Sequence, residues 1–255
     1  MIDIEKIADT VDAAARTATA IPQLSETIDM TVEEAYLVQA MALERRYSRG
    51  ERQVGIKMGL TSRAKMQQVG VDELLWGRLT NAMLVEDGGE IELSHYVHPR
   101  AEPEIAFLMK KPLSGPLSPA QAIAAVEAIA PAIEIIDSRY KDFQFSLSDV
   151  VADNSSSSGF VVGPWCRPDL DISNMGVVFE LDGHAAQIGS TAAILGHPAR
   201  SLAAASRMLG ADMLTLEQGW IVMAGGVTAA EPLSAGVHVR NTVENLGSVS
   251  FSVAG

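Results

Sequence analysis

This 255-residue chain has one cysteine, no long apolar run and no cluster of basic residues. Because Cys166 is alone, an intrachain disulfide is excluded and a reducing compartment is expected. No run of about 18 apolar residues is present, and residues 1–5 lack the basic start and apolar stretch of a signal peptide. We therefore expect a cytoplasmic protein that does not cross a membrane.

The formal net charge of −13 restricts the partners further. Lys and Arg form no stripe that could follow a phosphate backbone, so neither nucleic acid nor an anionic membrane is an expected partner. A hydrophobic content of 47% is enough for a sizeable buried core. We expect an N-terminal helical segment over residues 1–50 and a catalytic domain over residues 51–255.

The predicted elements favour an α+β fold. Apolar spacing predicts helices over 2–17 and from the capping box at Thr31 to about Ser48, and further helices at 62–69, 119–129 and 198–209. Short apolar or alternating segments predict strands near 53–58, 80–85, 90–93, 102–109, 132–137, 159–163, 176–181, 185–189, 219–224, 236–243 and 247–253. Because many strands follow one another directly, we expect a mixed, largely antiparallel β roll or barrel rather than a doubly wound parallel sheet.

Three glutamates in apolar surroundings are the main candidates for chemistry. Glu102 and Glu104 are separated by one residue in a predicted strand, so both carboxylates point to the same face. Glu134 lies in a second apolar run, where an unpaired charge is costly. Three such oxygen donors suit Mg²⁺ or Mn²⁺. The alternative is that the first two acids lie on the wet face of an edge strand and bind nothing.

Lys57, in the apolar run at residues 54–60, favours the metal site over that alternative because lysine is rarely buried without a partner. A lysine beside a divalent ion can hold or donate a proton near the reacting group. The competing interpretation of Lys57 is a structural salt bridge to one of the acids.

Several segments together resemble the hydratase/decarboxylase family of bacterial meta-cleavage pathways. They are residues 55–62 (GIKMGLTS), 99–107 (PRAEPEIAF), 134–140 (EIIDSRY), 151–154 (VADN) and 195–198 (LGHP). The resemblance extends from about residue 30 to the C-terminus. It implies the mixed β roll of the fumarylacetoacetate hydrolase C-terminal domain, Mg²⁺ or Mn²⁺ as cofactor, and Glu102, Glu104 and Glu134 as its ligands.

Two activities of that family compete, and three places in the sequence resemble the decarboxylase that acts on 4-oxalocrotonate (2-oxohex-3-enedioate). These are residues 136–140, residues 225–230 and Leu75, where many hydratases of 2-hydroxypenta-2,4-dienoate carry Asp. Hydration needs an acid or base near the far end of the substrate. Loss of CO₂ is favoured instead by an apolar wall against the departing carboxylate. Leu75 suits such a wall, although ordinary packing also explains a leucine.

The roles of the remaining candidates follow from the electron flow of decarboxylation. When the C6 carboxylate leaves, its bonding electrons run through the C3–C4 double bond into the C2 carbonyl that a divalent ion polarises. Lys57 is the candidate to stabilise or protonate the developing enolate. Arg139 is expected to orient Glu134 or to bind a substrate carboxylate. Asn154 and Ser157, within the serine tract 155–158, are candidates for lining the substrate pocket.

We therefore expect a metal-dependent carbon–carbon lyase whose partner is a small 2-oxo dicarboxylic acid. The decarboxylase is placed ahead of the dienoate hydratase. A diketo-acid carbon–carbon hydrolase is a third possibility, and a catalytically silent subunit that stabilises a hydratase is a fourth. The family resemblance also implies a homo-oligomer and a possible complex with a dienoate hydratase.

Overall fold

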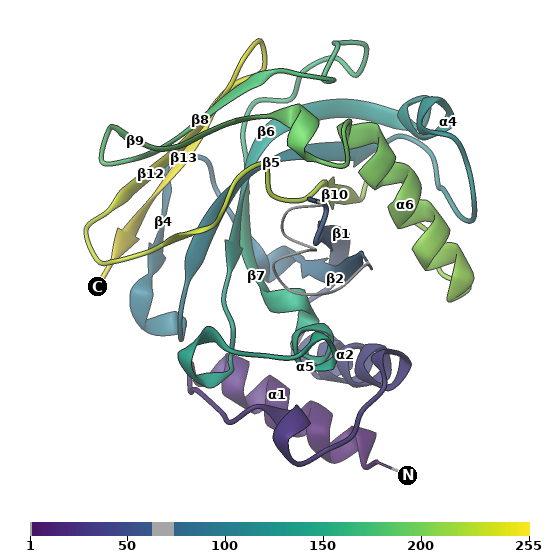
Figure 1. Ribbon diagram of the computed structural model, residues 1–255, viewed down its shortest axis with the longest axis vertical. Helices are drawn as coiled ribbons and strands as arrows, with labels where there is room; N and C mark the ends of the chain where they lie inside the picture. Colours follow the sequence, from purple (N-terminus) through teal and green to yellow (C-terminus); the bar gives the residue numbers. More distant parts are fainter. Residues whose placement is uncertain (1, 63–73) are drawn as a thin grey trace.

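The computed structural model describes residues 2–62 and 74–255, which form an α+β fold of two curled sheets and surrounding helices (Figure 1). The predicted fold class is confirmed. The predicted helix at 62–69 lies outside the described residues except for its first position. Among the described residues, no helix is both long and apolar enough to cross a membrane.

The larger sheet carries the candidate site, and its strands follow the order β2-β1-β10-β5-β6-β7-β3, with β11 paired to β5. Most neighbours are antiparallel, whereas β1 with β10 and β3 with β7 are parallel. The strands are β1 (Gln53–Gly59), β2 (Leu75–Thr80), β3 (Leu84–Val85), β5 (Arg100–Met109), β6 (Val126–Ile136), β7 (Ser157–Val162), β10 (Ile221–Met223) and β11 (Glu231–Pro232).

A second sheet covers one face of β5, β6 and β7. Its order is β4-β13-β12-β8-β9, formed by β4 (Gly89–Glu92), β8 (Gly176–Leu181), β9 (His184–Ser190), β12 (His238–Val243) and β13 (Gly247–Ala254). Odd-numbered residues of the larger sheet, among them Ala101, Ile133 and Ile135, pack against Phe179 and Phe251 of the second sheet in one apolar cluster. Side-chain alternation therefore directs the even-numbered residues of β5 and β6 to the opposite face.

Two helices, α4 (Pro119–Ile123) and α6 (Pro198–Ala211), cover the end of the larger sheet that the second sheet leaves open (Figure 1). Leu202 and Leu209 of α6 share an apolar cluster with Ile105 and Phe107 of β5 and with Ile56 of β1. The face of β5 that does not carry the glutamates is thus covered along its whole length, by α6 at one end and by the second sheet at the other.

The N-terminal helices α1 (Ile4–Arg16) and α2 (Val32–Ser48) pack with α5 (Leu147–Ala152) below the larger sheet (Figure 1). Their apolar cluster includes Val38 of α2, Leu75 of β2 and Val151 of α5. The side-chain amide of Gln39 donates hydrogen bonds to the carbonyl oxygens of Trp76 and Val151. Helix α2 therefore fixes β2 and α5 relative to each other.

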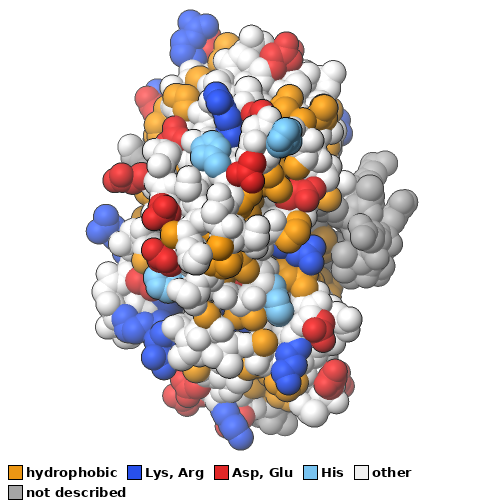
Figure 2. All heavy atoms as spheres, turned by 90° about the vertical axis from the view of Figure 1, so that its left-hand side faces the viewer, with side chains coloured by type: hydrophobic (Ala, Val, Ile, Leu, Met, Phe, Trp, Pro, Cys, Tyr) orange, Lys and Arg blue, Asp and Glu red, His pale blue; other side chains and the backbone are white. Residues whose placement is uncertain are grey.

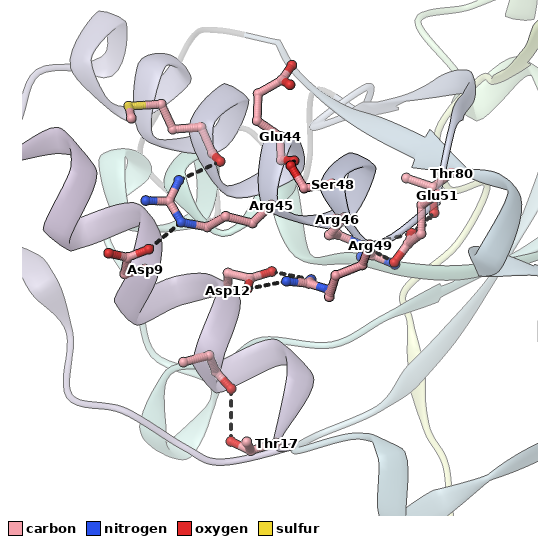
Figure 3. A network of polar contacts seen from close by, with 12 residues as sticks. Asp9, Asp12, Thr17, Glu44, Arg45, Arg46, Ser48, Arg49, Glu51 and Thr80 are labelled. Atoms are coloured by element: carbon pink, nitrogen blue, oxygen red, sulfur yellow. Dashed lines mark hydrogen bonds and ion pairs between the residues drawn. The ribbon is translucent and has the colours of Figure 1, made fainter.

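Ion pairs add to this packing at the surface of the two helices (Figure 3). Arg49, the C-cap residue of α2, pairs with Asp12 of α1 at 2.6 Å, and Arg46 of α2 pairs with Glu51 at 2.9 Å. Glu51 in turn accepts a hydrogen bond from Thr80 at the end of β2. This network links α1, α2 and the first two strands. On the face shown in Figure 2, Lys and Arg side chains are scattered among acidic and apolar ones.

Three sequence predictions of element boundaries are wrong. The helix predicted over 119–129 ends at Ile123, and the strand predicted over 132–137 already begins at Val126. Residues 126–131 are rich in alanine and isoleucine, but pairing with β5, as in Leu108 with Ala128, overrides their local preference. The strand predicted over 80–85 is instead β2 at 75–80, followed by a 3₁₀ turn and the two-residue β3.

A chain that begins at residue 51 tests whether the predicted catalytic domain folds without the helical segment. Because α2 covers apolar side chains of β2 and α5, we expect this shortened chain to bind a hydrophobic dye and to aggregate in size-exclusion chromatography. The full chain is the control. A monodisperse product with an unchanged melting temperature would contradict the expectation.

Candidate metal centre

Three buried carboxylates meet on the face of β5 and β6 that points away from the second sheet. Glu102 lies opposite Glu134 in the strand pairing, and Glu104 is the next residue on the same face of β5. Each glutamate offers one oxygen, and these oxygens all lie within 4.8 Å of one another. Glu104 and Glu134 have no exposed surface, and Glu102 is 7% exposed. The pairing of β5 with β6 thus places Glu134 beside two acids that lie 30 and 32 residues before it in the sequence.

Pro103 lies within β5 without breaking its pairing with β6. Pro103 would normally interrupt a sheet because it has no N–H. Its carbonyl oxygen accepts from the N–H of Val227 at 2.9 Å, and that of Ile105 accepts from Ala224, so the backbone groups of odd residues point away from β6. The missing N–H of Pro103 therefore removes no hydrogen bond between β5 and β6, and Glu102 and Glu104 stay in register with β6.

Lys57 reaches the same point from β1 and forms the salt bridge to one of the acids that its competing interpretation describes, whereas its role as a proton donor stays a prediction. Its Nζ lies 3.0 Å from Glu134 Oε2, and its side chain is 4% exposed. Burial raises the pKa of Glu104 well above the ordinary value, and the charges of Glu134 and Glu102 raise it further. Burial also raises the pKa of Glu134, although Lys57 opposes this. Lys57 is thus one ammonium beside Glu104 and Glu134, two carboxylates that have no exposed surface.

The remaining oxygens fit a divalent cation. Glu104 Oε2 accepts a hydrogen bond from the backbone N–H of Gly225 at 2.8 Å. Glu104 Oε1 and Glu134 Oε1 are buried and have no hydrogen-bond partner in the described parts of the chain. A divalent ion would neutralise the negative charge that one ammonium leaves on Glu104 and Glu134, and it would give their unpartnered oxygens a ligand. Hard oxygen donors of this kind suit such an ion.

Gly225 is a contribution to the site that the sequence analysis did not identify. Its φ of +106° lies in the region that favours glycine, and a β-carbon there would lie 2.0 Å from Thr61 Oγ1. Only glycine can therefore place this backbone N–H against Glu104. The sequence signal is the dipeptide Gly225-Gly226, which lies in the segment 225–230 that resembles the decarboxylase.

Leu75 lies close to the lysine across the pair β1 and β2. A β-carbon built on Gly59 would lie 2.3 Å from Leu75 Cδ1 and 3.8 Å from Lys57 Nζ, so both side chains converge on the same glycine. Leu75 also packs in the apolar cluster beneath α2 and α5. Leu75 therefore packs against the helices on one side and presents an apolar surface near Lys57 on the other.

Arg139 is placed differently from the expectation that it orients Glu134. Its guanidinium is 5% exposed, and it donates from Nε and Nη2 to Asp153 and from Nη1 to Ser158. No hydrogen bond or ion pair joins it to Glu134 in the part of the chain that the structure describes. Burial raises the pKa of Asp153 to about 6, although the arginine opposes this shift. Arg139 is thus occupied in holding the turn before β7.

Asn154 and Ser157 lie around a cavity of about 310 Å³ that Arg139 also lines and the three glutamates do not. The side chain of Asn154 accepts from the N–H of Arg78 at 2.8 Å and donates to its carbonyl at 2.9 Å. Ser157 Oγ is buried without a partner among the described residues. A role of these residues in substrate binding remains a prediction.

The turn that carries these side chains has an unusual backbone. Asn154, Ser155 and Ser156 have φ values of +49°, +54° and +59°. Left-handed conformation costs non-glycine residues roughly 1 to 2 kcal/mol each. Hydrogen bonds from Asn154 to β2 and from Ser155 Oγ to the carbonyl of Trp76 at 2.8 Å hold the turn in place. It thereby fastens the start of β7 to β2.

Asn241 is a second contribution that the sequence analysis missed. It lies on β12, has no exposed surface, and sits between the two sheets. Its Nδ2 donates to the carbonyl oxygen of Ala132 at 2.8 Å and lies 3.5 Å from that of Glu104. Glu104 and Ala132 are partners across β5 and β6. The amide therefore holds the strand pair directly behind the metal-facing carboxylate.

Comparison with known proteins gives consistent matches over most or all of the chain. The family model described as fumarylacetoacetate (FAA) hydrolase C-terminal matches residues 56–254. A 4-oxalocrotonate decarboxylase from Pseudomonas sp. is 56% identical over 252 residues, which are 99% of this chain and 98% of the relative. A 2-hydroxyhexa-2,4-dienoate hydratase from Comamonas testosteroni is 35% identical, over 88% of this chain and 86% of the relative.

A solved structure is similar over nearly the whole chain. It is 4-oxalocrotonate decarboxylase from Pseudomonas putida G7, complexed with magnesium and adipate. Its TM-score is 0.95 at 37% identity, and the match covers 98% of this chain and 97% of that one.

Replacement of Glu104 tests the metal centre. We expect Glu104→Ala to lose most of its affinity for Mn²⁺, measured by electron paramagnetic resonance of the free ion, because one of three ligands is removed. The metal-free variant should melt at the same or a higher temperature, because a buried carboxylate of raised pKa is lost. Glu127→Ala, on the exposed side of β6, is the matched control. Unchanged Mn²⁺ affinity in Glu104→Ala would exclude this acid from the site.

Replacement of Asn241 separates its effect on the site from its effect on stability. Asn241→Leu fills the same space in an apolar interface and removes a buried amide whose Oδ1 has no partner in the described residues. We expect an unchanged or raised melting temperature together with Mn²⁺ affinity lowered severalfold, because the strand pair behind Glu104 loses its anchor. If affinity and melting temperature fall in parallel, Asn241 has only a structural role.

Proposed function

Because the chain belongs to the fumarylacetoacetate hydrolase C-terminal family, we propose that it decarboxylates 4-oxalocrotonate (2-oxohex-3-enedioate) to 2-hydroxypenta-2,4-dienoate in a divalent-metal-dependent reaction. The observation that carries this choice is the 56% identity to a 4-oxalocrotonate decarboxylase over 252 residues, against 35% for the dienoate hydratase. The protein is then a carbon–carbon lyase of meta-cleavage degradation of aromatic compounds.

Glu102, Glu104 and Glu134 would hold the ion through one oxygen each. We propose Mg²⁺ ahead of Mn²⁺, since the similar solved structure contains magnesium. When bound, the ion supplies Lewis acidity to the carbonyl of the 2-oxo acid. The backbone N–H of Gly225 and the ammonium of Lys57 orient two of these carboxylates, so the ligand oxygens are placed before the substrate arrives.

Lys57 is the proposed proton donor. Cleavage of the C5–C6 bond releases CO₂, and the bonding electrons form the C4–C5 double bond while the former C3–C4 pair moves to C2–C3. The C2 carbonyl becomes an enolate oxygen, which needs one proton to give the 2-hydroxy product. Because Lys57 Nζ lies 3.0 Å from Glu134 Oε2, its ammonium is beside the carboxylates where the 2-oxo group would lie.

Leu75 supports decarboxylation over hydration. Its Cδ1 and Lys57 Nζ both lie within 4 Å of the position of a β-carbon on Gly59, so it offers an apolar surface beside the proton donor. A leucine can neither activate water nor move its proton, which hydration of the dienoate would need. A dienoate hydratase is the second candidate because of the 35% identity over most of the chain. A homo-oligomer and a complex with such a hydratase remain proposals.

A steady-state assay tests the activity. We expect the absorbance of 2-oxohex-3-enedioate to fall with release of one CO₂, the rate to vanish with a chelator, and Mg²⁺ to restore it. Water addition to 2-hydroxypentadienoate without CO₂ release would instead indicate a hydratase.

Replacement of Leu75 tests the apolar wall in the same assay. Leu75→Asp should lower kcat for decarboxylation at least about tenfold, because a charge near Lys57 competes for its proton and stabilises bound water. Leu75→Met keeps an apolar side chain of similar volume and should retain most of the activity. Equal rates in both variants would show that Leu75 is only a packing residue.

A further inference from the structure

The proposed substrate carries a second carboxylate that the metal centre does not accommodate. It is a dianion, and the chain has a net charge of −13 with three acids at the site, so a local cation is needed for the distal end. Lys57 is paired with Glu134, and Arg139 is occupied by Asp153. Neither side chain predicted from sequence is therefore available as the partner of that carboxylate.

Arg100 is a cation on the same face as the three glutamates. It is the first residue of β5 and pairs with Ile136, two positions beyond the pair of Glu102 and Glu134. The register of β5 with β6 is regular from Arg100 to Leu108. Alternation therefore places the side chains of Arg100, Glu102 and Glu104 in one row on one face.

The guanidinium of Arg100 is held by an aromatic ring rather than by an acid. Its Cζ lies 4.2 Å from the ring centroid of Phe143. Within residues 2–62 and 74–255, it has no hydrogen bond and no ion pair with a carboxylate. When the flat face of an arginine guanidinium stacks on a ring, the N–H groups at its edge can still donate hydrogen bonds to a carboxylate.

The spacing along the strand matches the length of the substrate. Two residues of a strand span roughly 6.5 Å, which separates the Arg100 and Glu102 positions. In an extended six-carbon chain, C6 lies roughly 5 Å from C2. A 2-oxo acid head group at the three glutamates therefore brings the C6 carboxylate within reach of a long arginine side chain.

We propose that Arg100, stacked on Phe143, forms the subsite for the distal carboxylate and so selects dicarboxylic over monocarboxylic 2-oxo acids. This inference rests on the proposed function for the identity of the substrate. The subsite binds the ground state, because the C6 carboxylate loses its charge as CO₂ forms. Arg100 therefore contributes more to KM than to kcat.

Two unreactive 2-oxo acids test the subsite. 2-Oxohexanedioate has the head group and the C6 carboxylate but lacks the C3–C4 double bond, and 2-oxohexanoate lacks the C6 carboxylate as well. We expect the native Mg²⁺-loaded protein to bind the diacid at least tenfold more tightly in calorimetry. Arg100→Gln should weaken diacid binding about tenfold and leave monoacid binding within about twofold.

Matched variants separate the subsite from a general effect of charge or folding. Arg240→Gln removes the same charge from the exposed side of β12 and should change neither affinity. Arg100→Lys keeps the charge without the fork and should recover part of the diacid preference. Phe143→Leu frees the guanidinium and should fall between the native protein and Arg100→Gln. In turnover, Arg100→Gln should raise KM about tenfold and change kcat less.

The proposal is overturned if Arg100→Gln weakens both acids equally or if diacid binding is unchanged. Its failure is distinct from failure of the proposed function. If the native protein decarboxylates 2-oxohex-3-enedioate but the variant keeps its diacid preference, only the subsite is wrong. If diacid preference depends on Arg100 but no CO₂ is released, the subsite stands and the decarboxylase assignment is wrong.

Discussion

The electrostatics of the site are set by three buried carboxylates whose ligand oxygens lie within 4.8 Å of one another and therefore repel each other. Burial and mutual repulsion both disfavour their charged forms, as the raised pKa of Glu104 shows. Lys57 pairs with Glu134, and Glu104 Oε1 and Glu134 Oε1 have no hydrogen-bond partner among the described residues. A site of this kind gains from a divalent ion more than from any further protein contact, because the ion neutralises the charge that the fold concentrates.

Most of the surrounding architecture holds these acids in place. The second sheet and α6 cover the far face of β5, and Asn241 anchors the strand pair from behind. Helix α2 fixes β2 and α5 on the other side, so that Leu75 lies close to Lys57 across β1 and β2. Polar backbone groups also contribute, since the N–H of Gly225 is available to Glu104 only because no side chain blocks that approach. The metal centre is thus supported from both sheets and from the helices.

The arrangement also separates two tasks that a dicarboxylic substrate imposes. The head group of the proposed substrate needs strong polarisation, and the glutamates, Lys57 and Gly225 lie together where they could provide it. The departing carboxylate needs an apolar wall for its reaction but a cation for its binding. In the function proposed here, Leu75 of β2 would supply the apolar wall and Arg100 of β5 the cation, so that binding and chemistry would not rely on the same side chain.

The sequence by itself determined the α+β class and most strands, and it singled out the three acids and Lys57 that the structure brings together. Those features depend on local periodicity and on charged residues within apolar runs, and both can be read directly from the sequence. It misplaced the start of β6, because strand pairing overrides the helical preference of residues 126–131. Only the tertiary structure decided that Arg139 pairs with Asp153, that Arg100 stacks on Phe143 and that Asn241 reaches the back of β5. Such contacts join residues that are distant in the chain. The sequence around a polar side chain does not indicate which partner the fold will place beside it.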